Sequence, residues 1–334
     1  MKAAVLTKVQ EITVQDVERP NAGPDDVLLK VMACGLCPAD YRVYSGQAMW
    51  KKPPTVLGHE FSGVVEEVGQ NVKLFKAGDK VVADRSDRCG YCKPCVSGSE
   101  NLCLNRHGVD EGALAQYALA KAVFTRKFSN ASYDEAAFTE PLSCVINGSR
   151  RTNIKLGSYV AIVGSGQIGL MQMQVVRALG GKTIMVDVRE DRLQLASKLG
   201  ADHVVNSSLA EAAAKVKEIT KGYGADRVIV AVSSKKAVEE GLGLLGKMGL
   251  LNIFASSYPS SITIDANLIH YGELTITGAY DKTRADFDNA IMLIDSGKID
   301  VKSLITQRLK LEQTWDGFKL MEKGAGVKII VEPN

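Results

Sequence analysis

A short apolar run followed by a glycine turn constrains the fold of this 334-residue chain more than any other feature. Residues 159–163 read YVAIV, and a continuous apolar run of this length is typical of a strand buried in a parallel sheet. The next residues read GSGQIG, and a helix-like stretch begins at Ile168. A GxGxxG string between a strand and a helix is the arrangement that binds a dinucleotide, whereas the string alone is weak evidence.

Each residue of this turn has a place in such a site. Gly164 permits the tight turn, Gly166 lets the backbone approach a pyrophosphate, and Gly169 permits close packing of helix against strand. Gln167 and Ile168 stand between the last two glycines, at the N-terminus of the expected helix. The free N–H groups and the positive dipole end of that helix favour a bound phosphate.

An acid follows at the position that separates the two nicotinamide cofactors. The next expected strand ends at Asp187, where a carboxylate accepts hydrogen bonds from the adenosine ribose and repels a 2′-phosphate. This predicts NAD. Arg189 and Arg192 lie close by and would instead accept a phosphate, so NADP is the alternative, and we count Arg192 among the cofactor-binding residues. A glycine turn with a surface aspartate and no ligand explains the strand, the spacing and the acid less well.

Strand-like and helix-like segments alternate from residue 157 onwards, which predicts a doubly wound α/β domain. The expected strands lie at 159–163, 183–186, 204–205, 228–232 and 250–254. The expected helices lie at 168–179, 192–199, 210–220 and 235–245. The first third of the chain instead has short strand-like runs at 27–31, 61–65 and 80–82, broken by turn residues, which favour a β-rich, barrel-like unit. The chain is long enough for two domains.

Four cysteines, Cys89, Cys92, Cys95 and Cys103, interrupt the β-rich part in a C-x2-C-x2-C-x7-C run. Thiolates this close together can converge on one tetrahedral zinc ion, and four of them leave no open position, so the expected site is structural. A pair of disulfides is the alternative, but nothing else in the chain suggests secretion. An iron–sulfur cluster also uses four thiolates, but the last spacing and the missing proline after it argue against that cluster.

The overall charge argues against several classes of partner. Lysine and arginine total 41 against 38 acidic residues, a net charge of +3, which does not favour nucleic acid or an anionic membrane. The first 20 residues alternate apolar and polar side chains and lack the apolar core of a signal peptide. Together with cysteines expected to be reduced, this predicts a cytoplasmic protein.

A second set of metal-ligand residues lies in the N-terminal third. His59 and Glu60 stand side by side before a strand, and Cys34 and Cys37 lie upstream. These are the ligand types of a catalytic zinc, which needs about three protein ligands and one exchangeable position. Taken alone, a His-Glu pair is more often a surface feature, and spacing does not tell which cysteine would bind.

Several motifs, in this order, resemble the zinc-dependent medium-chain alcohol and polyol dehydrogenases. The motifs are Cys37-Pro38-Ala39-Asp40, the GHExxGxVxxxG string at 58–69, the four-cysteine lobe, Glu140-Pro141-Leu142 and the glycine turn at 164–169. The resemblance implies an α/β protein with a GroES-like β-rich catalytic domain over 1–150, whose zinc lobe covers about 86–106. A Rossmann dinucleotide-binding domain over 151–281 follows, and a return over 282–334 completes the catalytic domain.

The same resemblance assigns roles to single residues. Cys37 matches the first ligand of the catalytic zinc and His59 the second. Asp40 matches the carboxylate that holds the tautomer and orientation of that histidine. Glu60 and Glu140 both match positions that approach the metal, and either one is the direct ligand or the two exchange during turnover.

Other positions bear on the substrate and the proton path. Members that act on simple alcohols often carry a cysteine near Glu140, so this glutamate points to the polyol, sugar or threonine branches. Cys34 would then be a non-ligand. Ala39 replaces a serine or threonine whose hydroxyl begins a proton relay, so the relay would run through water, a second substrate hydroxyl, Glu60 or Glu140. Asn147 stands where a histidine is common in the polyol branch.

The implied reaction is a reversible hydride transfer from a secondary alcohol of a polyol, sugar alcohol or its phosphate to NAD, with two zinc ions per chain. Lys282 would meet a substrate phosphate, or is a solvated lysine, which is more common. An L-threonine 3-dehydrogenase is the alternative enzyme. A catalytically weak NAD-binding regulatory or structural protein is the third interpretation, supported only by Ala39. The family resemblance also implies a homodimer or homotetramer.

Overall fold

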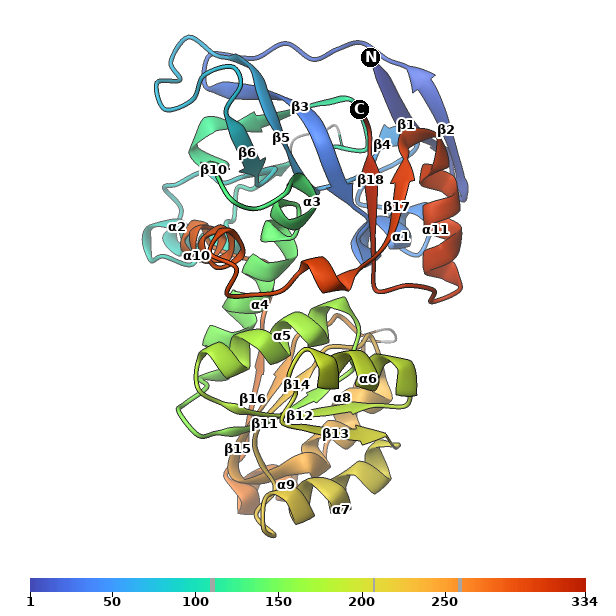
Figure 1. The fold of residues 1–334 in the computed structure, drawn as a ribbon. Helices are drawn as coiled ribbons and strands as arrows, with labels where there is room; N and C mark the ends of the chain where they lie inside the picture. The colour runs from blue at the N-terminus through green and yellow to red at the C-terminus, as the bar shows by residue number, and fades with distance from the viewer. Residues whose placement is uncertain (109–111, 207, 258–259) are drawn as a thin grey trace. The chain divides into compact units, whose positions relative to one another are not determined.

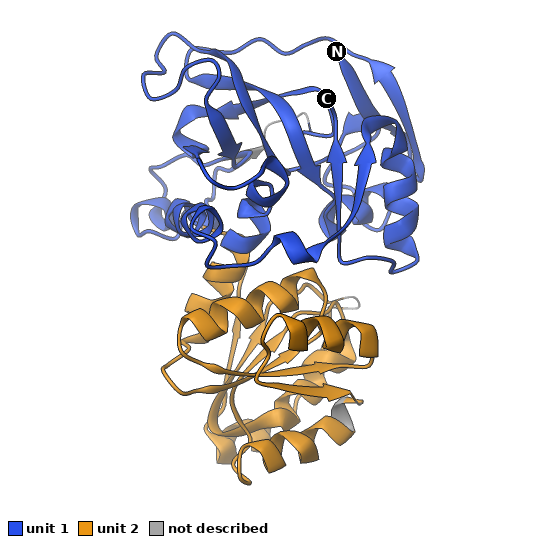
Figure 2. Ribbon diagram, viewed as in Figure 1, with its two compact units in different colours: residues 1–143, 283–334 blue, residues 144–282 orange. Residues whose placement is uncertain are grey.

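The structure is a computed structural model that describes residues 1–108, 112–206, 208–257 and 260–334. Two compact units share the chain (Figure 2): unit 1 is Met1–Ser143 with Thr283–Asn334, and unit 2 is Cys144–Lys282. Helix α4, Thr139–Thr152, crosses the first boundary between them. The sequence placed the corresponding boundaries after residues 150 and 281.

Unit 2 is built on a six-stranded parallel sheet with the strand order β13-β12-β11-β14-β15-β16. Its strands are β11 (Tyr159–Val163), β12 (Lys182–Asp187), β13 (His203–Asn206), β14 (Ala225–Val230), β15 (Leu245–Ile253) and β16 (Thr275–Gly278). Its helices are α5 (Gln167–Ala178), α6 (Glu190–Lys198), α7 (Leu209–Ile219), α8 (Lys235–Gly241), the 3₁₀ helix η3 (Leu242–Leu244) and α9 (Ala266–Gly272). Helices α5 and α6 cover one face and α7 the other (Figure 1). The predicted doubly wound domain is confirmed.

Apolar runs in the sequence became buried strands because both faces of a parallel sheet are covered by helices. Val163, Ile184 and Val228 of the central strands pack in one core with Val216 of α7 and Val238 of α8. The strand order reverses between β11 and β14, and the crevice outside the carboxyl ends of the strands at such a reversal is where a doubly wound sheet binds its ligand.

Two predicted boundaries in unit 2 were wrong. The helix expected at 235–245 ends as α8 at Gly241, and its last apolar residues form η3 and the start of β15. The strand expected at 228–232 begins at Ala225 and ends at Val230. Short apolar runs suit a helix and a buried strand equally well, so the pairing of β14 with β15 decided these ends.

Unit 1 is mostly β-structure. Its strands are β1 (Lys2–Lys8), β2 (Glu11–Asp16), β3 (Asp26–Gly35), β4 (Thr55–Val56), β5 (Glu60–Val68), β6 (Lys80–Ala83), β7 (Ser86–Asp87), β8 (His107–Gly108), β9 (Tyr117–Lys121), β10 (Thr125–Lys127), β17 (Ile305–Lys310) and β18 (Lys328–Glu332). Its helices are α1 (Pro38–Tyr44), α2 (Lys93–Val96), α3 (Tyr133–Ala136), α10 (Arg284–Asp295), α11 (Thr314–Glu322) and the 3₁₀ helices η1 (Glu100–Leu102), η2 (Ala122–Phe124), η4 (Lys302–Leu304) and η5 (Leu311–Gln313). The strands expected at 27–31, 61–65 and 80–82 lie within β3, β5 and β6.

The main sheet of unit 1 joins distant parts of the chain. Its order is β10-β6-β5-β3-β18-β17, with β9 also paired to β3. The C-terminal strand β18 lies beside β3 (Figure 1), with Val331 opposite Cys34. A second sheet, β2-β1-β4, and the short pair β7-β8 complete the unit. Because β3 pairs with both β5 and β18, the ends of these three strands meet around Gly35.

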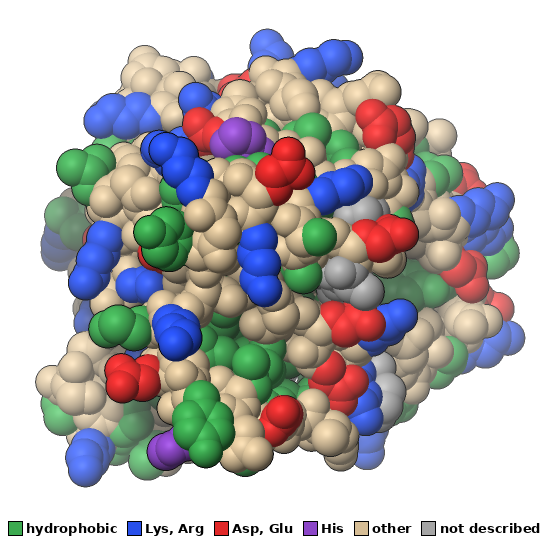
Figure 3. Space-filling view, turned by 90° about the horizontal axis from the view of Figure 1, so that it is seen from below, with side chains coloured by type: hydrophobic (Ala, Val, Ile, Leu, Met, Phe, Trp, Pro, Cys, Tyr) green, Lys and Arg blue, Asp and Glu red, His purple; other side chains and the backbone are tan. Residues whose placement is uncertain are grey.

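The surface carries charges of both signs. Lysine and arginine side chains are interspersed with aspartate and glutamate across the face seen in Figure 3, and hydrophobic side chains lie among them. Among the helices that the structure describes, none combines the length and the apolar character needed to cross a membrane.

Candidate active site and metal centres

Three potential zinc ligands meet where β3 and β5 begin and end in unit 1. The ligand atoms of Cys37, His59 and Glu60 all lie within 4.8 Å of one another. Cys37 precedes α1, and Glu60 is the first residue of β5, directly after His59. A thiolate, an imidazole and a carboxylate form a donor set suited to zinc with one position left open.

Local structure explains how two separate segments form this group. Antiparallel pairing sets Gly35 of β3 opposite Glu60 of β5. Cys37 then caps helix α1, and its sulfur accepts a hydrogen bond from the backbone N–H of Ala39 at 3.5 Å. Gly58 has a φ of +98°, and a Cβ there would lie 2.8 Å from the sulfur of Cys34, so a larger residue would displace the segment that carries His59.

Asp40 holds the imidazole of His59. Its Oδ1 lies 3.3 Å from Nδ1 of His59 and also accepts a hydrogen bond from the N–H of Gly58 at 3.3 Å. This leaves Nε2 as the nitrogen that faces a metal. The other oxygen, Oδ2, is buried and has no hydrogen-bond partner among the described residues.

The charges of the site favour a cation. Burial acts to raise the pKa of the Asp40 carboxyl, but His59 and the N–H of Gly58 outweigh it, so this pKa lies below its usual value. Burial acts to lower the pKa of His59, but Asp40 and Cys37 outweigh it and hold the imidazole pKa well above its usual value. A site that binds a proton this strongly has excess negative charge, so its residues fit a divalent metal ion.

Sequence reasoning missed Lys328, the first residue of β18. Its Nζ forms an ion pair with Oε2 of Glu60 and donates a hydrogen bond to the carbonyl of Leu36 at 3.1 Å. Lys328 and Glu60 are each 1% exposed. Burial lowers the pKa of the Lys328 ammonium to about 8, although the thiols of Cys37 and Cys34 act in the opposite direction. A lysine in the otherwise apolar run KIIV was the signal that pointed to it.

The other two candidates at this site lie apart from the three ligands. Glu140, on α4, is 7% exposed and is not a member of the group formed by Cys37, His59 and Glu60 in the part of the chain that the structure describes. Cys34 is fully buried, and its burial raises the pKa of the thiol to about 12. A protonated thiol is a poor metal ligand.

The four cysteines of the lobe form a second group. The sulfur atoms of Cys103 and Cys89 are 3.5 Å apart, those of Cys92 and Cys103 3.9 Å, and those of Cys89 and Cys95 4.0 Å. A disulfide needs about 2.05 Å, and all four cysteines are free thiols. Sulfurs at about 2.3 Å from one zinc ion would be about 3.8 Å apart. The disulfide alternative is therefore wrong in this structure.

Backbone N–H groups prepare these sulfurs for a metal. Cys92 donates to the sulfur of Cys89 at 3.4 Å, Cys89 donates to that of Cys103 at 3.4 Å, and Leu104 donates to that of Cys92 at 3.5 Å. Burial acts to raise the pKa of Cys89, but the N–H groups of Tyr91 and Cys92 outweigh it and lower the thiol pKa to about 6. The thiolate is the form that binds zinc.

Replacing Cys92 with serine is expected to remove one zinc ion and to lower the Tm by about 10 °C, because a metal that binds only the folded lobe stabilises it. Metal content and a thermal melt measure this. Ser97→Ala, in the same lobe, removes only an exposed hydroxyl that donates to the carbonyl of Pro94 and serves as the control. Iron in place of zinc in the native protein, or an unchanged melt of Cys92→Ser, would contradict the structural zinc.

The glycine turn of unit 2 has the geometry that the sequence required. Gly164 has a φ of +101°, and a Cβ there would lie 2.3 Å from Val232. A Cβ on Gly169 would lie 1.8 Å from the carbonyl oxygen of Gly164. At Gly166, the cap of α5, a Cβ would meet nothing within 4 Å, so open space remains beside the first N–H groups of Gln167 and Ile168. This is the space that a pyrophosphate needs.

Asp187 ends β12 beside this turn. Its Oδ2 accepts a hydrogen bond from the N–H of Ser165 at 2.6 Å, and its Oδ1 accepts one from the N–H of Arg189 at 3.0 Å. Both guanidinium edges of Arg189 reach Asp191, at 2.7 and 3.1 Å, while Arg192 on α6 is 9% exposed. The arginines therefore lie against unit 2 itself, and Asp187 presents the carboxylate at the turn.

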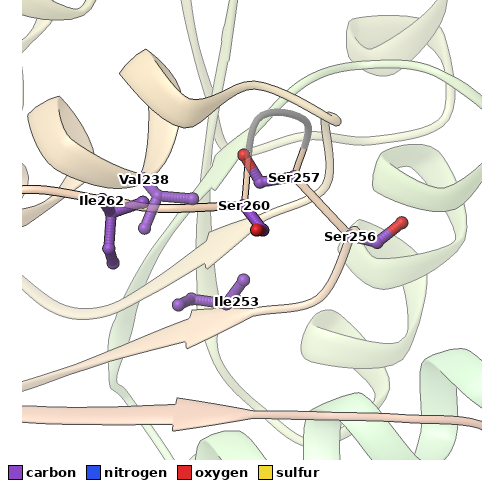
Figure 4. Close-up of a pocket in the computed structure, with 6 residues that line it drawn as sticks. All are labelled: Val238, Ile253, Ser256, Ser257, Ser260 and Ile262. Carbon is purple, nitrogen blue, oxygen red and sulfur yellow. The ribbon is translucent and has the colours of Figure 1, made fainter.

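A small cavity of about 290 Å³ lies beside the carboxyl end of β15 (Figure 4). Its lining residues are Val238, Ile253, Ser256, Ser257, Ser260 and Ile262. A volume at the lower end of the range for ligand pockets is too small for a whole dinucleotide. The cofactor site is therefore argued from the glycine turn and Asp187.

Two further positions are explained by the structure. Lys282 is 3% exposed and pairs with Asp281 at 3.2 Å, so the expectation of a solvated lysine was wrong. Asn147 is 2% exposed, and its amide nitrogen donates to the carbonyls of Tyr280 and Asp281.

Comparison with known proteins identifies the family. Residues 23–130 match the alcohol dehydrogenase GroES-like domain, and residues 168–296 match the zinc-binding dehydrogenase domain. The chain is 34% identical to a sorbitol dehydrogenase of Bacillus subtilis over 346 residues, covering 100% of this chain and 98% of that protein. It is 34% identical to a D-arabitol-phosphate dehydrogenase of Enterococcus avium (96% and 93% covered) and 32% identical to an L-threonine 3-dehydrogenase of Bacillus licheniformis (94% and 93% covered).

Solved structures agree with these relatives. A zinc-binding dehydrogenase of Sinorhizobium meliloti bound to NADP superimposes with a TM-score of 0.91 at 30% identity, covering 99% of both chains. An alcohol dehydrogenase of Escherichia coli complexed with NADH superimposes with a TM-score of 0.90 at 26% identity, covering 100% of this chain and 99% of that one. This chain belongs to the zinc-binding alcohol dehydrogenase family. The predicted family, the GroES-like and Rossmann fold class and the assignment as a zinc-dependent dehydrogenase are confirmed.

Proposed function

We propose that this protein is an NAD-linked polyol dehydrogenase that interconverts a secondary alcohol and its ketone. The observation that carries the proposal is the group formed by Cys37, His59 and Glu60, with Asp40 behind the histidine. Sorbitol and D-arabitol phosphate are named in relatives that match nearly the whole chain, which supports a polyol, a sugar alcohol or its phosphate as substrate.

Cys37, His59 and Glu60 are the proposed ligands of the catalytic zinc, and Cys89, Cys92, Cys95 and Cys103 those of a structural zinc. A zinc ion at the first site supplies a Lewis acid that favours ionisation of a bound hydroxyl. Asp40 keeps the His59 ring in one tautomer, and Lys328 offsets the charge of buried Glu60. Glu140 stays a candidate for a second carboxylate that approaches the metal during turnover.

The proposed cofactor is NAD, which accepts the hydride of the alcohol. The N-terminus of α5 would bind its pyrophosphate, at Gly164, Gly166, Gln167, Ile168 and Gly169. Asp187 would bind the adenosine ribose and repel a 2′-phosphate. The ion pair of Arg189 with Asp191 supports this preference because it occupies the guanidinium that would otherwise accept that phosphate.

Position 39 is an alanine, so no side-chain hydroxyl follows Cys37 to take the proton of the alcohol. That proton would leave through water, a second substrate hydroxyl, Glu60 or Glu140. A substrate with neighbouring hydroxyls supplies one of these routes itself, which fits a polyol better than a simple alcohol.

A substrate panel tests the reaction. The zinc-loaded protein is assayed by the absorbance of NADH or NADPH with polyols, polyol phosphates, simple alcohols and L-threonine, each with NAD⁺ and NADP⁺. We expect turnover of a polyol or its phosphate with NAD⁺. Threonine dehydrogenase is the second candidate, favoured by the relative from Bacillus licheniformis, and turnover of threonine alone would replace the polyol proposal with it.

The assembly and location complete the proposal. We infer a homodimer or homotetramer in the cytoplasm. Helix α9 has no buried residue, and β16 lies at one edge of the unit 2 sheet, which supports a further chain packing there. Free thiols at all seven cysteines suit a reducing compartment.

A further inference from the structure

Asn147 connects helix α4 to the segment that follows β16. Its amide nitrogen donates to the carbonyl of Tyr280 at 3.2 Å and to that of Asp281 at 2.9 Å. Its amide oxygen accepts a hydrogen bond from Arg150 at 2.9 Å, which fixes the nitrogen on the side of the two carbonyls. Because Asn147 is 2% exposed, water does not replace these bonds at little cost when they are lost.

A second side chain of α4 holds the same segment. Arg151 donates to the hydroxyl of Thr277 at 3.2 Å and to the carbonyl of Gly278 at 3.4 Å. The end of β16 and the residues after it are thus tied to one helix over five consecutive positions. Asp281 has a φ of +57°, a conformation that a non-glycine residue adopts only when its surroundings hold it there.

The tied segment lies on the cofactor edge of the sheet. Strands β14, β15 and β16 form the half of the sheet beyond the reversal, and residues 279–281 follow the carboxyl end of β16. In a doubly wound sheet the dinucleotide crosses this edge, and Asp187 lies on the other half, with β12. With the adenosine half of NAD at Asp187, the nicotinamide half falls on the side of β14 to β16.

The direction of the two carbonyls determines what the segment can present. In a planar trans peptide the C=O and N–H point in opposite directions. The carbonyls of Tyr280 and Asp281 face Asn147, so the N–H groups of Asp281 and Lys282 face away from α4. A nicotinamide carboxamide has both a donor and an acceptor, and a backbone edge of fixed direction can orient it.

We propose that Asn147 is a positioning residue for the nicotinamide half of the cofactor, acting through the backbone of Tyr280 and Asp281. This inference rests on the proposed use of NAD. It also accounts for an asparagine at this position, because one amide nitrogen with two hydrogens serves two adjacent carbonyls, whereas the single N–H that a neutral imidazole carries cannot.

The test compares a whole cofactor with its adenosine half. The affinities of NADH and of adenosine 5′-diphosphoribose, which lacks the nicotinamide, are measured on the zinc-loaded protein and on Asn147→Ala. We expect the Kd of NADH to rise about tenfold, the scale of two lost buried hydrogen bonds, and that of adenosine diphosphoribose to stay unchanged. Amide exchange at residues 279–282 should become faster in the variant.

Asn147→Asp retains the shape of the side chain and replaces the donor by an oxygen, so it serves if Asn147→Ala does not fold. Asn267→Ala, on the surface of α9, is the matched control and should change neither affinity. Equal loss for both ligands in both Asn147 variants, or no loss for either, would overturn the role of Asn147. A native protein that binds neither ligand would overturn the NAD proposal itself and this inference with it.

Discussion

Replacing Cys37 with serine is expected to remove one of two zinc ions per chain and to lower kcat/KM by at least about a thousandfold, since Lewis-acid polarisation is worth several kcal/mol. The fold should survive, because serine is a good helix N-cap and can accept the N–H of Ala39 as the sulfur of Cys37 does. Zinc content by atomic absorption and kcat/KM with the best substrate of the panel measure the two effects.

Cys34→Ala is the matched control for this variant. Cys34 lies three positions upstream of Cys37 and is also a free thiol, but it is buried in the core of unit 1. Its removal should leave both zinc ions bound and most of the activity, with a small loss of stability for the vacated volume. Loss of one zinc ion in Cys34→Ala and its retention in Cys37→Ser would exchange the roles of the two cysteines and refute the proposed ligand set.

Much of the fold and the ligand group could be predicted because their signals are local. The turn at 164–169 lies between the strand and helix that its glycines require, and the four lobe cysteines fall within fifteen residues. His59 and Glu60 are adjacent in sequence. The pairing of β3 with β5 then sets Glu60 opposite Gly35, close to Cys37, which no periodicity in the chain could show.

The features that sequence reasoning missed depend on partners far along the chain. Lys328 and Glu60 are 268 positions apart, and Asn147 and Asp281 are 134 apart. Each pair forms only because one strand or helix is laid against a distant one, and nothing in either segment names its partner. The choice between Glu60 and Glu140 was open for the same reason, since it depends on which carboxylate the folded sheet brings to Cys37 and His59.

Replacing Lys328 with methionine is expected to lower the free energy of unfolding by about 3–5 kcal/mol, because it leaves the carboxylate of Glu60 buried without its cation. Methionine has a similar length, so the loss reports on charge more than on volume. Urea denaturation measures it. Lys310→Met is the control: Lys310 pairs with Glu332 at 2.6 Å between the neighbouring strands β17 and β18, but its side chain is 64% exposed, so little change is expected.

A double variant separates the charge from the shape. Glu60→Gln in the Lys328→Met background removes the uncompensated carboxylate, so the pair of substitutions should cost less than the sum of the two single ones, by about 1–3 kcal/mol. Additive losses would mean that Lys328 stabilises β18 through packing alone and does not offset Glu60. A coupled result has a consequence for the metal: the same ammonium that stabilises Glu60 also competes with zinc for its carboxylate, so Lys328→Met should bind zinc at the Cys37 site more tightly than the native protein does.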